Sequence, residues 1–477
     1  MSNSIPQETS ELHRVLGPLA ASAILAGTVI GTGIFLVPST IAREVGSVGM
    51  VFLVWIAGAL LSLAGALTYA ELGSTFPAAG GEYVFLRRAY GPLWGFLFGW
   101  QQVVIGKTGS IASIAIASAL FLGYFADGLD REVARFEAAG QIFRVTGLQL
   151  TAIAGIALLT AINTAGVILG GAVQSLLTAL KVGAILALAA LVLGSGRGSW
   201  SHFDVALEPA SPSLSDRAAG FGAALAAALW AYDGWNAVTL VGAEIRNPRR
   251  TIPRVLILGV LGVALVYMLA NLAYFYALPF DAVKHSERVA QDAARVVLGE
   301  WGGAALSCAA LISTLATLNG SILTGARVAY AMARDGLFFR PVAQLHPARR
   351  TPANALALQA LLASGLILLF GRDKAAFERL FDYALFGTWG FYGLTVLSVI
   401  ALRYRHPELP RPYLTLGYPW IPLTFALVAV LFCISIAMRR PYETGFGLIL
   451  LATGLPFYGF WRRSGAARFS SRDEERN

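Results

Sequence analysis

The chain has 477 residues, of which 56% are hydrophobic and only 13% are charged, and its mean hydropathy is +0.65. Soluble domains carry about 25% charged residues, so the composition excludes an ordinary soluble protein and predicts one that lies in lipid. The net charge of +9 requires no nucleic-acid partner, because basic residues beside membrane spans set the orientation of those spans.

The composition also argues against an enzyme. The two cysteines, Cys308 and Cys433, fall inside predicted spans and are expected to be small buried residues that form no disulfide. The five histidines are far apart in tails and loops, so neither metal-ligand spacing nor a Ser/His/Asp group is present. We therefore expect no catalytic residues, no metal and no cofactor.

Apolar runs long enough to cross about 30 Å of hydrocarbon recur along the whole chain and predict one all-α membrane domain with twelve spans. The first six spans cover 15–45, 49–76, 91–124, 147–167, 169–194 and 217–245. The second six cover 252–278, 301–334, 352–371, 379–402, 418–438 and 442–461. The polar segments 1–14 and 462–477 are then tails. The first span is expected to stay in the mature protein, because 1–14 lacks the basic pattern of a signal peptide.

Positive charge predicts the orientation of the spans. When the N-terminus is placed inside, the inner loops and tails collect most of the arginines, among them Arg87, Arg88, Arg249 and Arg250. The outer loops carry nearly equal numbers of basic and acidic residues. The positive-inside rule therefore predicts a multi-pass protein of the plasma (inner) membrane with both termini in the cytoplasm.

Two spans are interrupted by glycine at membrane depth. The first is broken at Gly31-Thr32-Gly33, and the sixth at Tyr232-Asp233-Gly234-Trp235-Asn236. Irregular backbone is tolerated at this depth only where it lines a cavity or is buried in protein. Five spans separate the breaks, as two inverted five-helix repeats would give, and such paired breaks are the best sequence pointer to a transporter's binding site.

The two breaks together would suit a small zwitterion. Carbonyls freed at Trp230 and Ala231 would bind an ammonium group, and amides freed at the first break would bind a carboxylate at a half-helix N-terminus. These amides belong to Ile30, Gly31, Thr32, Gly33 and Ile34. The alternative for the two glycines is close helix packing, but the matching break in the sixth span favours a binding site for an α-amino acid.

Five motifs occur in order along the chain. They are IGTGIF (30–35), YAELGSTFPAAGGEYVFLRRAYGP (69–92), WAYDGWN (230–236) with EIRNPRRTIP (244–253), NGSILTGARVAYAMARDGLF (319–338) and LRYRHPELPRPY (402–413). Together they resemble the amino acid–polyamine–organocation (APC) superfamily and its L-amino-acid-transporter (LAT) subgroup. The resemblance implies a LeuT-type fold, in which 15–194 and 217–402 form inverted 5+5 repeats with helices 1 and 6 unwound, and the two helices in 418–461 are peripheral.

The resemblance also implies roles for two residues. Lys181 lies near the centre of the fifth span, where a charge costs at least about 2.5–3.5 kcal/mol on insertion scales and needs a partner. In related transporters a lysine at this place takes the position of a structural sodium ion between spans one, five and eight. Lys181 would tether the first break in the same way, with a static internal pair or a proton-coupling group as alternatives. Trp230 would be an aromatic gate over the substrate, with ordinary helix packing as the alternative.

Three other polar residues inside spans have open roles. Asp233 either attracts the side chain of a cationic amino acid or caps the broken helix, and we favour the cap and hence neutral substrates. Lys107 either borders the pocket and pairs with a carboxylate such as Asp233, or snorkels along the bundle. Asn319 either contributes to the cavity or bridges helices. In the loops, Gly80-Gly81-Glu82-Tyr83 is expected to form a cytoplasmic turn with charge pairs, and 279–300 a short amphipathic helix.

The sequence thus predicts a sodium-independent transporter that exchanges or imports small to medium neutral L-amino acids by alternating access. A proton-coupled or cationic amino-acid transporter is the alternative. A channel would need a continuous polar lining and a sensor a soluble output domain, and the sequence has neither. Animal members of the subgroup bond a glycoprotein heavy chain through a loop cysteine. This chain has no loop cysteine, so the expected partners are amino-acid substrates and the lipid bilayer, without a disulfide-linked heavy chain.

Overall fold

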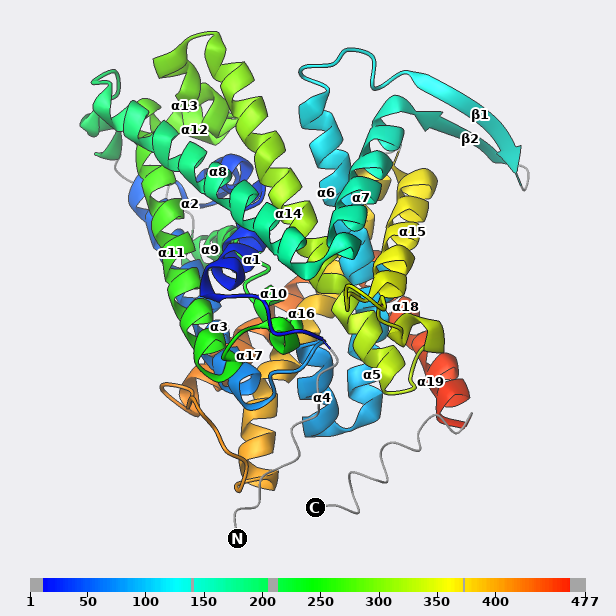
Figure 1. Cartoon of the computed structure of the whole chain (residues 1–477). Coiled ribbons are helices and arrows are strands. Elements are labelled where there is room, and N and C mark those ends of the chain that lie inside the picture. Colours follow the sequence, from blue (N-terminus) through cyan, green and yellow to red (C-terminus); the bar gives the residue numbers. More distant parts are fainter. Residues whose placement is uncertain (1–11, 139–140, 205–212, 372–373, 464–477) are drawn as a thin grey trace.

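The computed structural model describes residues 12–138, 141–204, 213–371 and 374–463. It is a bundle of helices with one β-hairpin (Figure 1). The first part of the chain forms α1 Pro18–Val29, α2 Gly33–Val45, α3 Val48–Thr75, α4 Glu82–Tyr90, α5 Pro92–Gln101, α6 Lys107–Leu122, β1 Glu132–Ala138, β2 Gln141–Thr146, α7 Gly147–Ala165 and α8 Val167–Gly194.

The second part of the chain forms the remaining helices: α9 Leu214–Ala231, α10 Ala237–Leu240, α11 Pro248–Ala277, α12 Phe280–His285, α13 Val289–Leu298, α14 Trp301–Arg334, α15 Ala353–Phe370, α16 Lys374–Arg405, α17 Trp420–Arg439, α18 Pro441–Ala452 and α19 Gly454–Arg463. One π-helical turn, Gln102–Gly106, joins α5 to α6, and 3₁₀ turns occur at Trp200–Phe203, Gly242–Glu244 and Arg340–Ala343.

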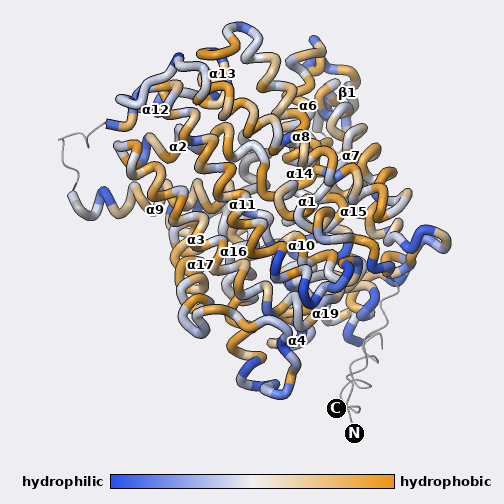
Figure 2. Tube along the Cα trace, turned by 60° about the vertical axis from the view of Figure 1, so that its left-hand side comes forward, coloured by the Kyte–Doolittle hydropathy of each residue, from blue (hydrophilic) through white to orange (hydrophobic). Residues whose placement is uncertain are grey.

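The described residues contain ten helical segments long and apolar enough to cross a membrane, or eleven if α1 and α2, which meet at 44°, form one broken span. This confirms a helical membrane protein with a broken first span. Hydrophobic residues dominate the helices in Figure 2, and hydrophilic ones gather in the connections near the termini. The predicted sixth span is not among the eleven, because α9 begins with a polar turn and α10 has only four residues. Twelve spans therefore remain a prediction.

Capping residues explain where several helices begin. The Thr146 hydroxyl and the Gln149 side chain form a capping box at the start of α7, and Ser213 and Asp216 form another at the start of α9. Gly46, with a φ of 70°, ends α2 in the left-handed conformation that favours glycine. The local sequence thus sets these boundaries independently of tertiary packing.

Two loops differ from the prediction. Segment 125–146, expected only as a loop, contains the antiparallel hairpin β1–β2, in which Arg135 pairs with Arg144 and Phe136 with Phe143. Its alternating apolar residues suit a strand. The loop 279–300 forms two helices, α12 and α13, instead of one.

Equivalent spans of the two predicted repeats pack against each other. Helix α3 packs along α11, α6 along α14, and α7 against α15. In the prediction these helices are spans two and seven, three and eight, and four and nine. The packing therefore pairs three spans of the first predicted repeat with the spans five positions later.

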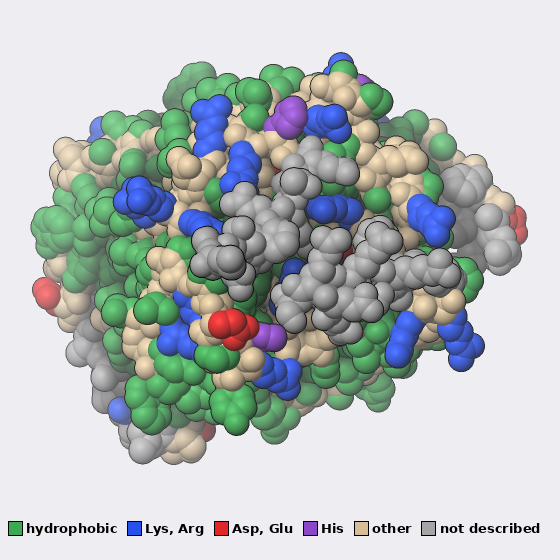
Figure 3. Space-filling view, turned by 60° about the horizontal axis from the view of Figure 1, so that its bottom comes forward, with side chains coloured by type: hydrophobic (Ala, Val, Ile, Leu, Met, Phe, Trp, Pro, Cys, Tyr) green, Lys and Arg blue, Asp and Glu red, His purple; other side chains and the backbone are tan. Residues whose placement is uncertain are grey.

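One end of the bundle is rich in basic side chains. The described chain begins and ends at the same end of the molecule, which we call the termini face, while the hairpin and α13 lie at the opposite end, the hairpin face (Figure 1). Lys and Arg side chains gather on the termini face (Figure 3). The exposed arginines in the connections and helix ends on this side include Arg14, Arg88, Arg246, Arg249 and Arg250. The predicted tails lie largely outside the described residues.

Candidate substrate site at two broken helices

The two predicted breaks exist, and they contact each other. Helix α1 ends at Val29 and α2 begins at Gly33, while α9 ends at Ala231 and α10 begins at Ala237. The Thr28 hydroxyl lies 3.0 Å from the carbonyl oxygen of Gly234. Gly234 has a φ of +101°, and a Cβ there would lie 3.3 Å from the Thr28 backbone, so only glycine fits this crossing easily.

The two glycines of the first break have different surroundings. A Cβ on Gly33 would lie 2.9 Å from Cβ and 3.0 Å from Cα of Ala231, and 3.7 Å from the Trp230 ring. Gly33 is therefore a close-packing position against the sixth span, which was the alternative interpretation. A Cβ on Gly31 would have one neighbour within 4 Å, the Thr317 hydroxyl at 3.9 Å. Gly31 and Thr32 are half-buried, so this part of the break has free space beside it.

Lys181 satisfies the carbonyl groups that the first break frees. Its side chain is fully buried, and its ammonium donates to the carbonyl oxygens of Gly27 at 2.7 Å and Ile30 at 2.5 Å. The Thr317 hydroxyl on α14 is 3.3 Å away. Because α1 ends here, these carbonyls have lost their intrahelical donors, and the ammonium replaces them. Lys181 thus lies among spans one, five and eight, as expected.

Hydroxyl groups from other helices supply further hydrogen bonds to the backbone carbonyls at the two breaks. The sequence analysis did not predict these hydroxyl groups. The Tyr267 hydroxyl on α11 lies 3.1 Å from the Val29 carbonyl and 2.8 Å from the Ala231 carbonyl. The Ser313 and Thr317 hydroxyls each lie 3.3 Å from the Ile30 carbonyl. Ser313 and Thr317 are four residues apart, which places them on one helix face, and this spacing was the available signal.

The amide side of the first break has no helical partners, because the first amides of any helix lack intrahelical acceptors. The free amides of α2 begin at Gly33, and the Phe35 amide already donates to the Thr32 carbonyl at 3.1 Å.

At the sixth span, the Trp230 carbonyl accepts a hydrogen bond from the Asp233 amide at 3.2 Å, and the Ala231 carbonyl accepts one from the Tyr267 hydroxyl. Each carbonyl oxygen has a second lone pair with which it could bind an ammonium group.

Burial differs on the two sides of the breaks. Every residue is buried in 235–245 and in 316–333, which lie between the breaks and the termini face. Toward the hairpin face, 301–315 of α14 includes exposed and half-buried residues, and so does α9. Trp230, the predicted gate, is half-buried. The structure is therefore sealed between the breaks and the termini face.

Three contacts form this seal. Arg327 on α14 makes a two-pronged ion pair with Glu244, at 3.1 and 2.9 Å, and both side chains are buried. The Leu16 amide donates to the Glu244 carbonyl at 2.9 Å, and the Gly80 amide to the Leu240 carbonyl at 2.9 Å. The chain before α1, the loop before α4 and the segment after α10 are thus joined to α14.

The contacts around the Gly80–Tyr83 turn differ from the predicted charge pairs. The Tyr83 hydroxyl donates to the Asp335 carboxylate at 2.6 Å, and the ion pair with this carboxylate, also at 2.6 Å, comes from Arg87 farther along α4. Glu82 is not part of a surface charge pair, because it is fully buried and accepts a hydrogen bond from the Asn236 amide. Burial raises the pKa of the Glu82 carboxyl to about 7, and Asp233 adds to the rise, whereas the Asn236 hydrogen bond and the Lys107 charge oppose it.

Asp233 and Lys107 lie near each other at the sixth-span break. One Asp233 oxygen accepts the Tyr392 hydroxyl of α16 at 2.9 Å, and its charge interacts with that of Lys107. No ion pair of 4.0 Å or less joins Lys107 to an acid among the described residues. Both residues are half-buried. This arrangement brings Lys107 near the sixth-span break, within range of the Asp233 charge.

Two other residues differ from the prediction. Asn319 is fully buried, donates to the Gly170 carbonyl and the Gln174 side chain, and accepts from Asn163. Its amide bridges helices, which was the second of its two predicted roles, and we withdraw it from the site. Cys308 was expected to be buried but is exposed on α14, whereas Cys433 is half-buried.

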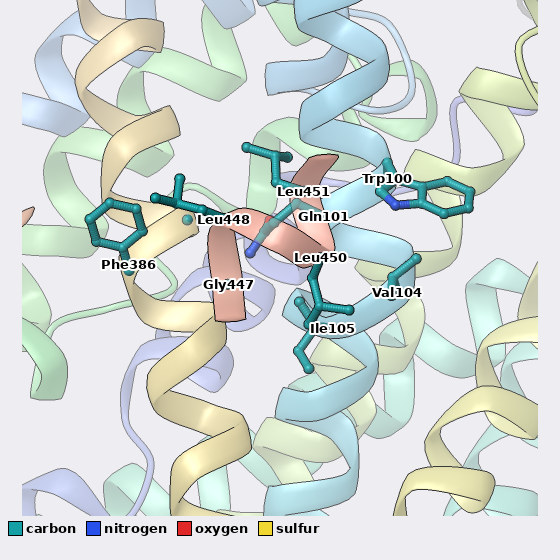
Figure 4. A pocket seen from close by; sticks show the side chains of 10 residues that line it. Trp100, Gln101, Val104, Ile105, Phe386, Gly447, Leu448, Leu450 and Leu451 are labelled. Atoms are coloured by element: carbon teal, nitrogen blue, oxygen red, sulfur yellow. The ribbon is translucent and has the colours of Figure 1, made fainter. Parts of the chain in front are cut away.

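A small cavity of about 20 Å³ lies away from the breaks, where Gln101, Phe386 and Leu451 come together from α5, α16 and α18 (Figure 4). A volume of this size holds about one water molecule. It is too small for an amino acid, so it does not compete with the breaks as a substrate site.

A helical membrane protein whose two broken helices meet at a partly accessible polar centre, sealed on one side, is a transporter of small solutes. The chain matches the amino acid permease model over residues 16–456. It belongs to this family of the APC superfamily, and is therefore an amino-acid transporter and not an enzyme.

Its relatives are exchangers and transporters of the LAT group. The chain is 31% identical to the serine/threonine exchanger SteT of Bacillus subtilis over 461 residues, 96% of this chain and 99% of the relative. It is 30% identical to the human b(0,+)-type amino acid transporter 1, over 94% of this chain and 88% of the relative. It is 32% identical to the mouse large neutral amino acids transporter small subunit 2, over 94% and 81%.

Proposed function

We propose that the protein is a sodium-independent exchanger of small to medium neutral L-amino acids. The contact between the two breaks is the main support. The amides of the first break, around Gly31, would bind the substrate carboxylate, and the carbonyls of Trp230 and Ala231 its ammonium group. The Trp230 ring would cover the bound substrate. Residues 30–34 together with Trp230, Ala231 and Asp233 would then form the site.

The independence from sodium follows from Lys181. Its ammonium occupies the place beside the Gly27 and Ile30 carbonyls where a sodium ion would need the same oxygens. Two cations cannot share these ligands at such distances without strong repulsion. The lysine would hold the first break in place permanently, without an ion to be bound and released.

The orientation is part of the proposal. The arginines on the termini face support a cytoplasmic location of both termini and insertion in the plasma (inner) membrane. In that orientation the structure is closed toward the cytoplasm and more open toward the outside. The transport cycle would open the seal formed by Arg327 and Glu244 and close the hairpin side.

We propose the LeuT-type arrangement with twelve spans, α9 and α10 being the two pieces of the sixth. The packing of α3 on α11, α6 on α14 and α7 on α15 supports inverted repeats. Helices α17 to α19 would be peripheral. Since Cys308 and Cys433 both lie on helices, we propose that no disulfide-linked heavy chain is attached.

A cationic substrate is the second candidate, because Asp233 is half-buried beside the site. A free carboxylate there would attract a lysine or arginine side chain. Lys107 lies close enough to interact with the Asp233 charge, and Tyr392 occupies one of the carboxylate oxygens. These contacts reduce the attraction for a cationic side chain and favour neutral substrates.

The test is uptake by purified protein in sodium-free liposomes, with a panel of labelled neutral, cationic and acidic amino acids. Internal unlabelled amino acid is present or absent, and a pH gradient is imposed or not. Uptake of neutral amino acids that requires internal amino acid supports the proposal. Uptake into empty vesicles driven by an acidic exterior, or only after sodium is added, would contradict it.

A further inference from the structure

Glu82 is a buried carboxylate with one unpartnered oxygen. The side chain is 0% exposed, and the Asn236 amide donates to Oε1. Oε2 is buried and forms no hydrogen bond of good geometry in the described part of the chain, although the Tyr69 hydroxyl approaches this carboxyl group. An ionised carboxylate in this position would lack a donor that it needs.

The charged groups that face Glu82 do not balance. Lys107 faces it from α6 and Asp233 from the sixth-span break, while the neutral phenols of Tyr69 on α3 and Tyr392 on α16 complete its surroundings. Helix α5, which packs on α4, has no ionisable side chain. On α14, Arg327 is already paired with Glu244.

This cluster therefore holds one cation and two carboxyl groups. If both carboxyls were ionised, a net negative charge would be buried without a counter-ion. Burying such a charge costs several kcal/mol, and a carboxyl group in this situation takes up a proton instead. Asp233 accepts the Tyr392 hydroxyl and is half-buried, so it is the better stabilised anion. Glu82 is the group that should be neutral.

We propose that Glu82 is a proton-binding site, which is occupied while the termini face is sealed and releases its proton when the seal opens. This inference rests on the proposed transport function. The ligand is a single proton, exchanged with water, and no other reactant is required.

Hydrogen bonds connect Glu82 to the moving parts. Asn236, which donates to Glu82, has its side-chain oxygen 3.2 Å from the Tyr392 hydroxyl, and this hydroxyl donates to Asp233. The residues just before Glu82 are bonded to α10, since the Gly80 amide donates to Leu240. Separation of α10 from this loop would break these contacts and expose the carboxyl group to water, where its ionised form is stable.

The pKa of Glu82, raised by burial to about 7, agrees with this cycle, because exposure to water would return the pKa toward its ordinary value near about 4.3. At neutral pH the exposed group would then lose its proton. Opening the seal is therefore favoured at high pH and opposed at low pH.

The first experiment does not depend on transport. Infrared difference spectra of the purified full-length protein, titrated between about pH 5 and about pH 9, should contain a protonated-carboxyl band that disappears near neutrality. The band should be absent in Glu82→Gln and present in Glu287→Gln, a control at an exposed position of the hairpin face. Persistence of the band in Glu82→Gln would overturn the assignment.

The second experiment measures amino-acid exchange in liposomes with equal pH on both sides. The wild-type rate should fall as the pH drops below about 7, and Glu82→Gln should stay at the slow acidic rate at every pH. Lys107→Gln removes the positive charge that opposes protonation, so its infrared midpoint should move to higher pH even if transport is lost. An unchanged pH profile in Glu82→Gln, or an unmoved midpoint in Lys107→Gln, would contradict the proposal. Failure of all variants and of the wild type to exchange would instead contradict the transport function.

Discussion

The ammonium nitrogen of Lys181 lies 2.5 Å from the carbonyl oxygen of Ile30, although the two residues are 151 positions apart in the sequence. Ile30 is the first residue after α1, so its carbonyl no longer receives an intrahelical hydrogen bond. By supplying that donor, the lysine offsets the hydrogen bond lost where the first helix is interrupted. The break and the buried charge, each costly alone in a membrane, are compatible because they satisfy each other.

Replacement of this ammonium should therefore destabilise the protein. Lys181→Met keeps most of the apolar side chain but leaves the Gly27 carbonyl without its donor, and the expected loss is about 1–3 kcal/mol, the cost of an unsatisfied buried acceptor. Thermal unfolding in detergent measures the loss. Ser175→Ala on the same helix is the control, since its hydroxyl bonds within its own helix, to Gly171, and its removal should cost less than about 1 kcal/mol. Equal stability of Lys181→Met and wild type would disprove the tether.

Alanine substitutions at Gly31 and Gly33 can be compared to test the proposed substrate site. Gly31→Ala adds a methyl group where there is space, so stability should remain within about 0.5 kcal/mol, but the methyl would occupy the region proposed for the substrate carboxylate. We expect at least a tenfold loss in kcat/KM for exchange, a loss of about 1.4 kcal/mol in transition-state stabilisation.

Gly33→Ala should behave differently. The new Cβ would lie 3.0 Å or less from Cα and Cβ of Ala231, so overpacking should lower stability by about 1–3 kcal/mol. Melting temperature and initial exchange rate, measured on both variants, separate the two roles. Normal transport by a stable Gly31→Ala variant would remove Gly31 from the proposed site.

The breaks and Lys181 could be predicted because each violates a rule that most membrane spans obey. Glycine pairs, an aspartate and a lysine at membrane depth are visible in the sequence without knowledge of the fold. The groups that satisfy them were not predicted. Tyr267, Ser313 and Thr317 come from other spans, and hydroxyl groups are common enough in membrane helices that none stands out before the helices are assembled.

The burial of Glu82 could not be predicted, because its local sequence is that of an ordinary exposed turn. Its neighbours Gly80, Gly81 and Tyr83 read as a polar turn, and a glutamate in such a turn is normally solvated. Its burial results from the close approach of α10, where a Cβ on Gly81 would lie 2.8 Å from the Thr239 hydroxyl. The π-helical turn before Lys107 was not predicted either, because nothing in the sequence Gln102–Gly106 distinguishes it from regular helix.

The Arg327–Glu244 pair should hold the termini face closed. Glu244→Gln leaves a buried guanidinium without its counter-ion, so the sealed state should lose about 3–5 kcal/mol relative to an open one. In a variant without native cysteines, a cysteine introduced at Ala331, a buried position of α14, should react faster with a thiol reagent when Glu244→Gln is added.

The control for this prediction is Arg295→Gln, which breaks an exposed ion pair with Asp292 on α13. Exposed pairs contribute about 0–1 kcal/mol, so the labelling rate at position 331 should not change. Equal labelling of the Glu244→Gln protein and its parent would show that this pair does not stabilise the seal.

Glu82 should also make stability depend on pH. Its pKa is higher in the folded protein, about 7, than in the unfolded chain, about 4.3, so the folded state binds more protons between these values. Stability is then greatest at the acidic end and decreases as the pH rises toward about 7, by roughly 4 kcal/mol at most. Glu82→Gln cannot ionise and lacks this contribution. The difference in melting temperature between Glu82→Gln and wild type should therefore grow in favour of the variant between about pH 5 and about pH 8. Glu287→Gln should follow the wild type throughout. A constant difference across this range would mean that Glu82 has the same proton affinity in the folded and unfolded chains.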